Sequence, residues 1–133
     1  MLYIILGIFF ILHGLVHLLY AGQSLRMFEL QPGMTWPDGS WAFKSLFGEK
    51  AIRVFGGVLC LLATDGFVIG AILLFLSHDF WRPLITWSAI FSALVFIFLW
   101  DGKMQALHNK GLIGILINAV ILIIVLGLNW PAF

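Results

Sequence analysis

The stretch LYIILGIFFILHGLVHLLYA, residues 2–21, decides the fold of this 133-residue chain. About 20 residues, at ~1.5 Å of helix rise each, cover the ~30 Å hydrocarbon core of a bilayer. His13, His17, Tyr20 and Ser24 follow one another at steps of four, three and four, so a helix places them on one face. Because polar side chains facing lipid are costly, we expect this face to point into a bundle of helices.

The composition is that of a membrane protein. Hydrophobic residues make up 62% of the chain and charged residues 10%, against about 45–50% and ~25% in soluble domains. The net charge of only +1 argues against a nucleic-acid partner. The single cysteine, Cys60, excludes an internal disulfide. The first span has no charged segment before it and no cleavage site after it, so we expect a retained helix rather than a signal peptide.

The chain contains four long apolar runs, and none shows the strict alternation of a β-barrel strand. They predict an all-α fold, a four-helix transmembrane bundle that forms a single domain over residues 1–133. The predicted spans are about 2–21, 52–76, 84–100 and 112–128. The expected environment is the lipid bilayer of the cell membrane.

The connection between the first two spans, residues 23–50, is long and rich in turn residues. Asp38 or Ser40 is placed to cap a short helix that ends at Gly48. Its aromatic residues are too many for a solvated loop: Trp36, Trp41, Phe43 and Phe47. Two interpretations follow. The segment is either a short interfacial helix with its rings at headgroup depth, or a lid over a cavity between the helices.

The basic residues predict the orientation of the chain. Loops one and three, with their margins, hold Arg26, Lys44, Lys50, Arg53, Lys103 and Lys110, whereas loop two holds only Arg82. Since basic residues accumulate on the cytoplasmic side, loops one and three are predicted to be cytoplasmic and both termini outside.

Each predicted span carries a polar residue in the middle third of the membrane. Together they predict a buried polar cluster of His13, His17, Asp65, Thr64, Tyr20 and Asn118. Asp65 is the most expensive of these, at about 2.5–3.5 kcal/mol if it faces lipid. We therefore expect it within direct or one-water hydrogen-bond reach of His13 or His17. The cluster either relays protons or binds a polar ligand, or it only fixes the helix register. Packing contact is the favoured interpretation for four of the polar residues: Thr64, Ser88, Ser92 and Asn118.

Metal, haem and enzymatic chemistry find little support in the sequence. His13 and His17 are four residues apart and, with Asp65, offer a set of two histidines and one carboxylate. The HxxxH spacing lacks the adjacent general base of a zinc protease. Two histidines on one helix face cannot clamp a haem iron from opposite sides. No nucleophile elbow is present. The sequence therefore favours no metal and no enzyme, while quinone, haem and metal stay open as cofactors.

The second span contains the glycine-rich run Phe55-Gly56-Gly57-Val58-Leu59-Cys60-Leu61-Leu62-Ala63, followed by Gly66 and Gly70, and the first span contains Gly7 and His13-Gly14. With the long first loop, this layout resembles the DoxX-like four-helix membrane proteins. The resemblance implies a four-helix membrane fold and a small subunit of a membrane redox system, such as a quinone-linked oxidoreductase. The chain departs from that pattern in lacking a basic N-terminus and in its predicted orientation.

Three functions are compatible with these observations. The first is a non-catalytic accessory subunit of a membrane complex, of a redox or quinone-linked kind. The second is a small proton-coupled transporter or channel that uses Asp65, His13 and His17. The third is a lipid-binding protein or membrane enzyme with its site beneath the aromatic loop. A chain this small leaves much helix surface facing lipid, so we expect a homo-oligomer or membership of a larger complex.

Overall fold

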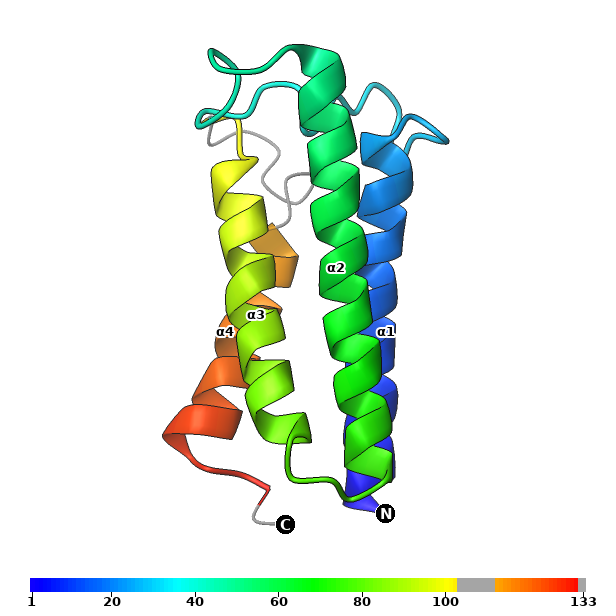
Figure 1. Cartoon of the computed structure of the whole chain (residues 1–133), viewed down its shortest axis with the longest axis vertical. Helices are drawn as coiled ribbons and strands as arrows, with labels where there is room; N and C mark the ends of the chain where they lie inside the picture. Colours follow the sequence, from blue (N-terminus) through cyan, green and yellow to red (C-terminus); the bar gives the residue numbers. More distant parts are fainter. Residues whose placement is uncertain (103–111, 132–133) are drawn as a thin grey trace.

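The computed structural model describes residues 1–102 and 112–131. These residues form four α-helices and no strand (Figure 1). The helices are α1 (Leu2–Ser24), α2 (Glu49–Phe75), α3 (Trp81–Phe98) and α4 (Leu112–Leu122), which continues as the π-helical segment η2 (Ile123–Gly127). The predicted all-α, four-helix class is confirmed. Lys103, His108 and Lys110 lie outside the described residues.

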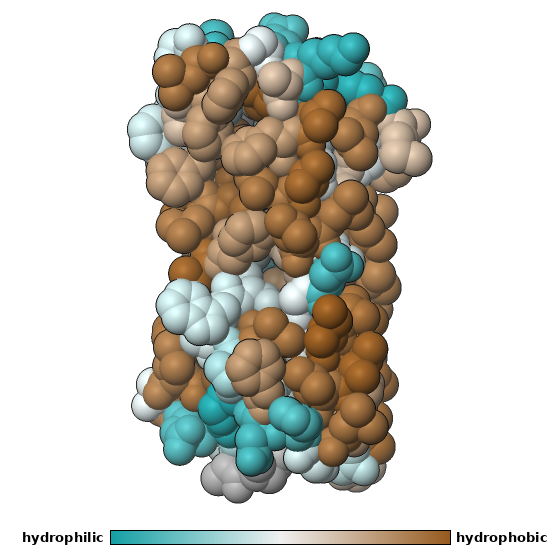
Figure 2. Space-filling view, in the orientation of Figure 1, coloured by the Kyte–Doolittle hydropathy of each residue, from teal (hydrophilic) through white to brown (hydrophobic). Residues whose placement is uncertain are grey.

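Three of the helices, α1, α2 and α3, are long and apolar enough to cross a membrane. At ~1.5 Å per residue, the 18 residues of α3 extend about 27 Å and the 27 residues of α2 about 40 Å. The fourth, Leu112–Gly127, is a shorter apolar helix. Figure 2 shows a broad hydrophobic surface between two ends where hydrophilic residues gather. The chain is therefore built as an integral membrane protein.

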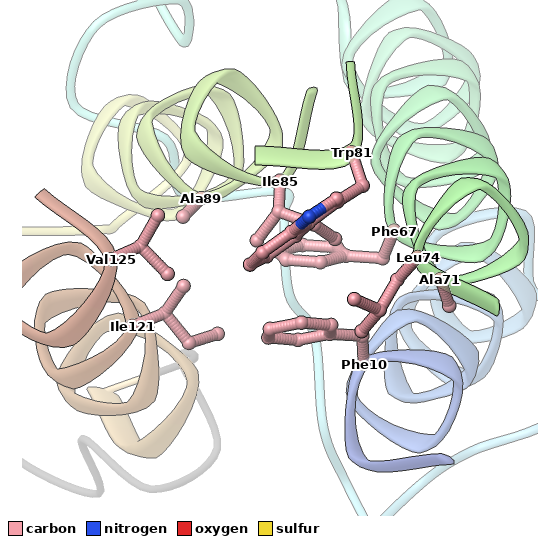
Figure 3. Packing of buried hydrophobic residues seen from close by; sticks show 9 residues of the cluster. All are labelled: Phe10, Phe67, Ala71, Leu74, Trp81, Ile85, Ala89, Ile121 and Val125. Carbon is pink, nitrogen blue, oxygen red and sulfur yellow. The ribbon is translucent and has the colours of Figure 1, made fainter. Parts of the chain in front are cut away.

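Each helix packs mainly against its neighbour in the sequence, and α2 and α3 lie in front of α1 and α4 in Figure 1. The N-terminus lies at the end of the bundle opposite the long first connection. Two apolar clusters fill the interior. One, shown in Figure 3, contains Phe10, Phe67, Ala71, Leu74, Trp81, Ile85, Ala89, Ile121 and Val125. The other contains Ala21, Met34, Trp36, Ile52, Cys60, Val95, Phe96 and Leu99.

The helices α1 and α2 approach closely at Gly14. A β-carbon added there would lie 2.9 Å from Phe67 Cβ, closer than packed carbon atoms come. At the same place the Thr64 hydroxyl lies 3.0 Å from the carbonyls of both Gly14 and Cys60, which share its single hydrogen. Thr64 therefore joins α1 to α2 instead of taking part in a wider polar cluster.

The first connection does not contain the expected short helix. Between residues 40 and 47 the chain forms successive turns, in which the Lys44 N–H bonds to the Ser40 carbonyl and the Phe47 N–H to the Phe43 carbonyl, both at 2.9 Å. These are isolated helical hydrogen bonds that do not continue into a regular helix.

The donors of this segment serve α3 instead. The Ser40 hydroxyl donates to the Phe98 carbonyl at 2.6 Å, and the Trp41 indole donates to the Ile97 carbonyl at 2.7 Å. The last carbonyls of a helix have no partner within the helix. The first connection supplies those partners, which is the physical reason why it follows the end of α3 rather than its own helical path.

Candidate functional site

A chain of hydrogen bonds joins three helices midway between the two apolar clusters. His13 Nε2 on α1 lies 2.8 Å from Asn118 Oδ1 on α4. Asn118 Nδ2 donates to Ser92 Oγ on α3 at 2.8 Å, and Ser92 Oγ lies 2.5 Å from His17 Nε2. None of these four side chains is more than 4% exposed. We call this set of four residues the polar chain.

The partners assign the protonation of the histidines. His17 Nδ1 lies 2.9 Å from the His13 carbonyl, which only accepts, so Nδ1 carries the hydrogen. Nε2 of a neutral His17 then accepts from the Ser92 hydroxyl, while the Asn118 carbonyl accepts from His13 Nε2–H. Donors and acceptors alternate along the whole polar chain. Two neutral histidines therefore satisfy every bond, and no ion is needed inside the bundle.

The helix α2 completes the enclosure with an aromatic ring. The Phe67 ring meets His13 edge-on, with 4.8 Å between ring centroids, and stacks on His17 at 5.5 Å. Buried polar groups are stabilised when all of them are paired and water is excluded. The helix α2 thus contributes no hydrogen bond to the polar chain, but its Phe67 ring covers the two histidines.

The expected pairing of Asp65 with His13 or His17 is wrong. Asp65 is exposed, and it forms no hydrogen bond or ion pair with any described residue. The reason is its position on α2: Thr64 and Phe67 face α1, and successive residues turn by about 100°, which carries residue 65 away from that face. The metal set of His13, His17 and Asp65 is not formed, and within residues 1–102 and 112–131 no three His, Cys, Asp or Glu side chains gather.

Tyr20 belongs to an aromatic group near the first connection rather than to the polar chain. Its ring centroid lies 5.2 Å from that of Trp36 and 4.9 Å from that of Phe96. Trp36 is 6% exposed, and its indole Nε1 has no hydrogen-bond partner among the described residues. The other aromatic residues of the predicted lid are exposed or half-buried: Trp41, Phe43 and Phe47. Of these four rings, only that of Trp36 is buried in an apolar cluster, and Phe43 packs against the same cluster.

Ion pairs that were not predicted from the sequence hold the first connection. Asp38 accepts from Arg26 Nη2 at 2.8 Å, and from Arg53 Nε and Nη2 at 2.8 and 2.7 Å. Partial burial opposes ionisation of Asp38, but the hydrogen bond from Arg53 and the charges of both guanidinium groups lower the pKa of this carboxyl below its ordinary 3.8. The available signal was that both arginines belong to the same predicted side of the membrane as Asp38.

Two further residues were also underestimated. Gln23 is fully buried at the end of α1, where its Nε2 donates to the Met34 carbonyl at 3.0 Å and its Oε1 accepts from the Leu30 N–H at 2.9 Å. Ser92, interpreted as a packing contact, is the centre of the polar chain. Its signal was an expected depth close to that of Asn118.

The arrangement can hold helices together or pass protons along hydrogen bonds, but its atoms are closed off from diffusing ligands. No family model matches the chain, and no curated protein or solved structure is significantly similar to it. The resemblance to the DoxX-like proteins therefore stays a prediction from the sequence.

Proposed function

We propose that this protein is a non-catalytic accessory subunit of a membrane complex. One observation carries the proposal: the four side chains of the polar chain are paired with one another inside the bundle, whereas the Asp65 carboxyl is exposed on the outside at a similar depth. A catalytic or transporting centre has to present polar groups to its substrate, and the polar chain is enclosed. The unpaired carboxyl group of Asp65 instead lies on the outer surface of the bundle, where it can contact another protein.

An exposed Asp65 calls for a protein neighbour. About 15 Å of helix separate it from the end of α2 at Phe75, and more separate it from the start at Glu49. A carboxyl group at that depth costs about 2.5–3.5 kcal/mol against lipid. Contact with another transmembrane surface that carries a hydrogen-bond donor removes this cost.

The finer parts of the proposal come from the sequence. The DoxX-like resemblance supports a redox or quinone-linked complex, in which this chain itself holds no assigned cofactor or metal. The distribution of basic residues supports both termini outside and loops one and three in the cytoplasm. Asp38, Arg26 and Arg53 would then secure the first connection on the cytoplasmic side.

The proposal is tested by native mass spectrometry after gentle extraction from the membrane of origin. We expect the chain in an assembly with other subunits, and we expect Asp65→Leu to lower the mass of that assembly. Leu15→Ala, on the exposed face of α1, is the matched control and leaves the assembly intact. A chain that never appears with another protein would overturn the accessory role.

A second candidate is a proton-coupled transporter or channel, and the continuous polar chain is the observation that favours it. In liposomes with an imposed pH gradient, this candidate requires proton flux that is lost in His17→Leu. The accessory role predicts no flux above that of empty liposomes for either protein.

A further inference from the structure

The outer face of α2 and α3 carries two polar side chains beside a close helix contact. Gly66 on α2 lies against Ser88 on α3, so that a β-carbon at Gly66 would overlap the Ser88 hydroxyl. The two helices run in opposite directions. The residues that precede these two in the sequence, Asp65 and Trp87, therefore turn to the same side of the helix pair.

The residues on the other side of this contact support the assignment. Phe67 and Ala89 follow Gly66 and Ser88 in the sequence, and both are fully buried in the apolar cluster between the helices (Figure 3). Asp65 and Trp87 must accordingly face outward. Figure 2, in which α2 and α3 are in front, shows a hydrophilic patch within the hydrophobic surface of this face.

Asp65 and Trp87 are a complementary acceptor and donor without partners. The Trp87 side chain is 65% exposed, and neither residue forms a hydrogen bond with any described residue. An indole N–H only donates, and a carboxyl group accepts whether or not it is protonated. A bond between the two groups is therefore available in either protonation state of Asp65.

The depths of the two residues fit a symmetric pair of chains. Measured along the helix axes, Asp65 and Trp87 are about 3 Å apart, because each lies one residue from the Gly66–Ser88 contact. Two copies with the same orientation in a membrane are related by a two-fold axis along the membrane normal, so residues of equal depth meet. In such an interface residue i contacts residue j, and j contacts i. Asp65 of each copy then faces Trp87 of the other.

The rest of this face suits a protein contact within the bilayer. The exposed side chains of Leu62 and Ile69 on α2 and of Leu94 on α3 are apolar. Among the described residues, the outer helix surface at this depth offers no cation, because His13 and His17 are buried and already bonded. Trp87 is thus the donor that the chain itself supplies to Asp65.

We therefore propose that the α2–α3 face binds a second copy of this chain through two equivalent hydrogen bonds from Trp87 Nε1 to the Asp65 carboxyl of the other copy. The inference rests on the proposed function for one premise, that this face meets protein rather than lipid. It goes further in naming the partner and the pair of residues.

Cysteine cross-linking in native membranes tests the proposal. In a Cys60→Ala background, Leu62→Cys reports on the proposed face and Val16→Cys on the exposed face of α1. The two positions lie at similar depths, because the neighbouring Gly14 is packed against Thr64 and Phe67. With a short bismaleimide we expect a product of twice the chain mass from Leu62→Cys and none from Val16→Cys.

The residue pair is tested on the same background in liposomes at several dilutions. Trp87→Phe keeps the ring but removes the donor, and Asp65→Leu removes the acceptor; each abolishes both symmetric bonds. We expect the dissociation constant of the dimer to rise about tenfold in each variant. Asp65→Asn keeps an acceptor oxygen and should retain the dimer.

The outcomes separate this inference from the proposed function. Cross-linking of Leu62→Cys to a different protein only would overturn the inference and leave the accessory role standing. Self cross-linking in a chain that native mass spectrometry finds with no other subunit would support the inference and overturn the accessory role. Self cross-linking that Trp87→Phe and Asp65→Leu leave unchanged would overturn the assigned pair. No cross-link from Leu62→Cys would overturn the inference, while native mass spectrometry would still decide the accessory role.

Discussion

Asn118 and Asp65 lie at similar depths in two helices of one bundle, and their surroundings are opposite. Asn118 is fully buried and bonded to His13 and Ser92, whereas Asp65 is exposed and bonded to no described residue. A position within a span fixes the depth of a side chain, but the face of the helix decides whether it meets protein or the surroundings. Polar residues at one depth can therefore serve cohesion inside the bundle or contact outside it.

The largest effect is expected from replacing Asp65, the exposed residue of the two, and it concerns the free energy of membrane insertion. Asp65→Leu should lower the apparent free energy of membrane insertion of segment 49–75 by about 3 kcal/mol, because a central Asp is costly in hydrocarbon and Leu is favourable. A glycosylation-based insertion assay measures the change. Asp79→Leu, outside the predicted spans, should leave insertion unchanged, and an equal response of both variants would place Asp65 outside the hydrocarbon.

Replacing the buried residue, Asn118, should have a smaller effect, and this effect should be unfavourable. Asn118→Leu removes the partner of His13 Nε2 and one of the two partners of Ser92, so we expect the free energy of unfolding in mixed micelles to fall by about 2 kcal/mol. Ser88→Ala is the control, because the Ser88 hydroxyl donates to the Leu84 carbonyl of its own helix. If both variants lose the same stability, the polar chain has no special role.

Asp38 provides a further comparison with Asp65, because its carboxyl group is paired with two arginines and its contribution to stability should depend on pH. We expect Asp38→Asn to lower stability by about 1 kcal/mol at neutral pH, because Arg26 and Arg53 lose an ionised acceptor. Since the pKa of Asp38 is lowered in the fold, the contribution is complete above its ordinary 3.8 and is lost as the pH falls through the lowered value.

Thermal unfolding of both proteins between neutral and acidic pH checks this expectation. The difference between wild type and Asp38→Asn should shrink on acidification, while Glu49, which lies 3.6 Å from Arg53, remains common to both. A difference that stays constant across the whole range would show that ionisation of Asp38 is not what stabilises the connection.

The smallest effect is expected at Thr64, next to Asp65 but on the inner face. Thr64→Val removes one hydrogen bond to Gly14 on α1 and should cost about 0.6 kcal/mol, the average for such bonds in a membrane. Thr86→Val is the control, since the Thr86 hydroxyl donates to the Arg82 carbonyl of its own helix. Equal losses in unfolding experiments would remove the inter-helix contribution of Thr64.

The fold was largely predictable because apolar runs of bilayer length have few alternatives to helices. The spacing of His13 and His17 also predicted correctly that they face inward. Asp65 could not be placed in the same way, because the residues around it in the second span are almost all apolar and mark no polar face of the helix. Its rotation depends on Gly66 and Phe67, whose contacts exist only once α1 and α3 are in place.

The first connection was the least predictable region. Asp38 and Ser40 are ordinary helix-capping residues, and nothing local indicates that their partners are Arg53 and the end of α3 instead. Such contacts are far apart in the sequence, and tertiary hydrogen bonds override local propensity where they satisfy the open end of another helix. The aromatic residues of the first connection therefore indicated that it is amphipathic, but they did not indicate which parts of the bundle it contacts.

The hydrogen bonds between the first connection and α3 also set an order of events during biosynthesis. Trp41 and its acceptor Ile97 are 56 residues apart, so at ~5–20 residues per second the ribosome needs roughly 3–11 s to supply the second after the first. Until then the Trp41 side chain has no docking point. The first two helices must therefore remain in the membrane with an unfinished loop, which makes the nascent two-helix stage the period when this chain is most open to proteolysis and to chaperones.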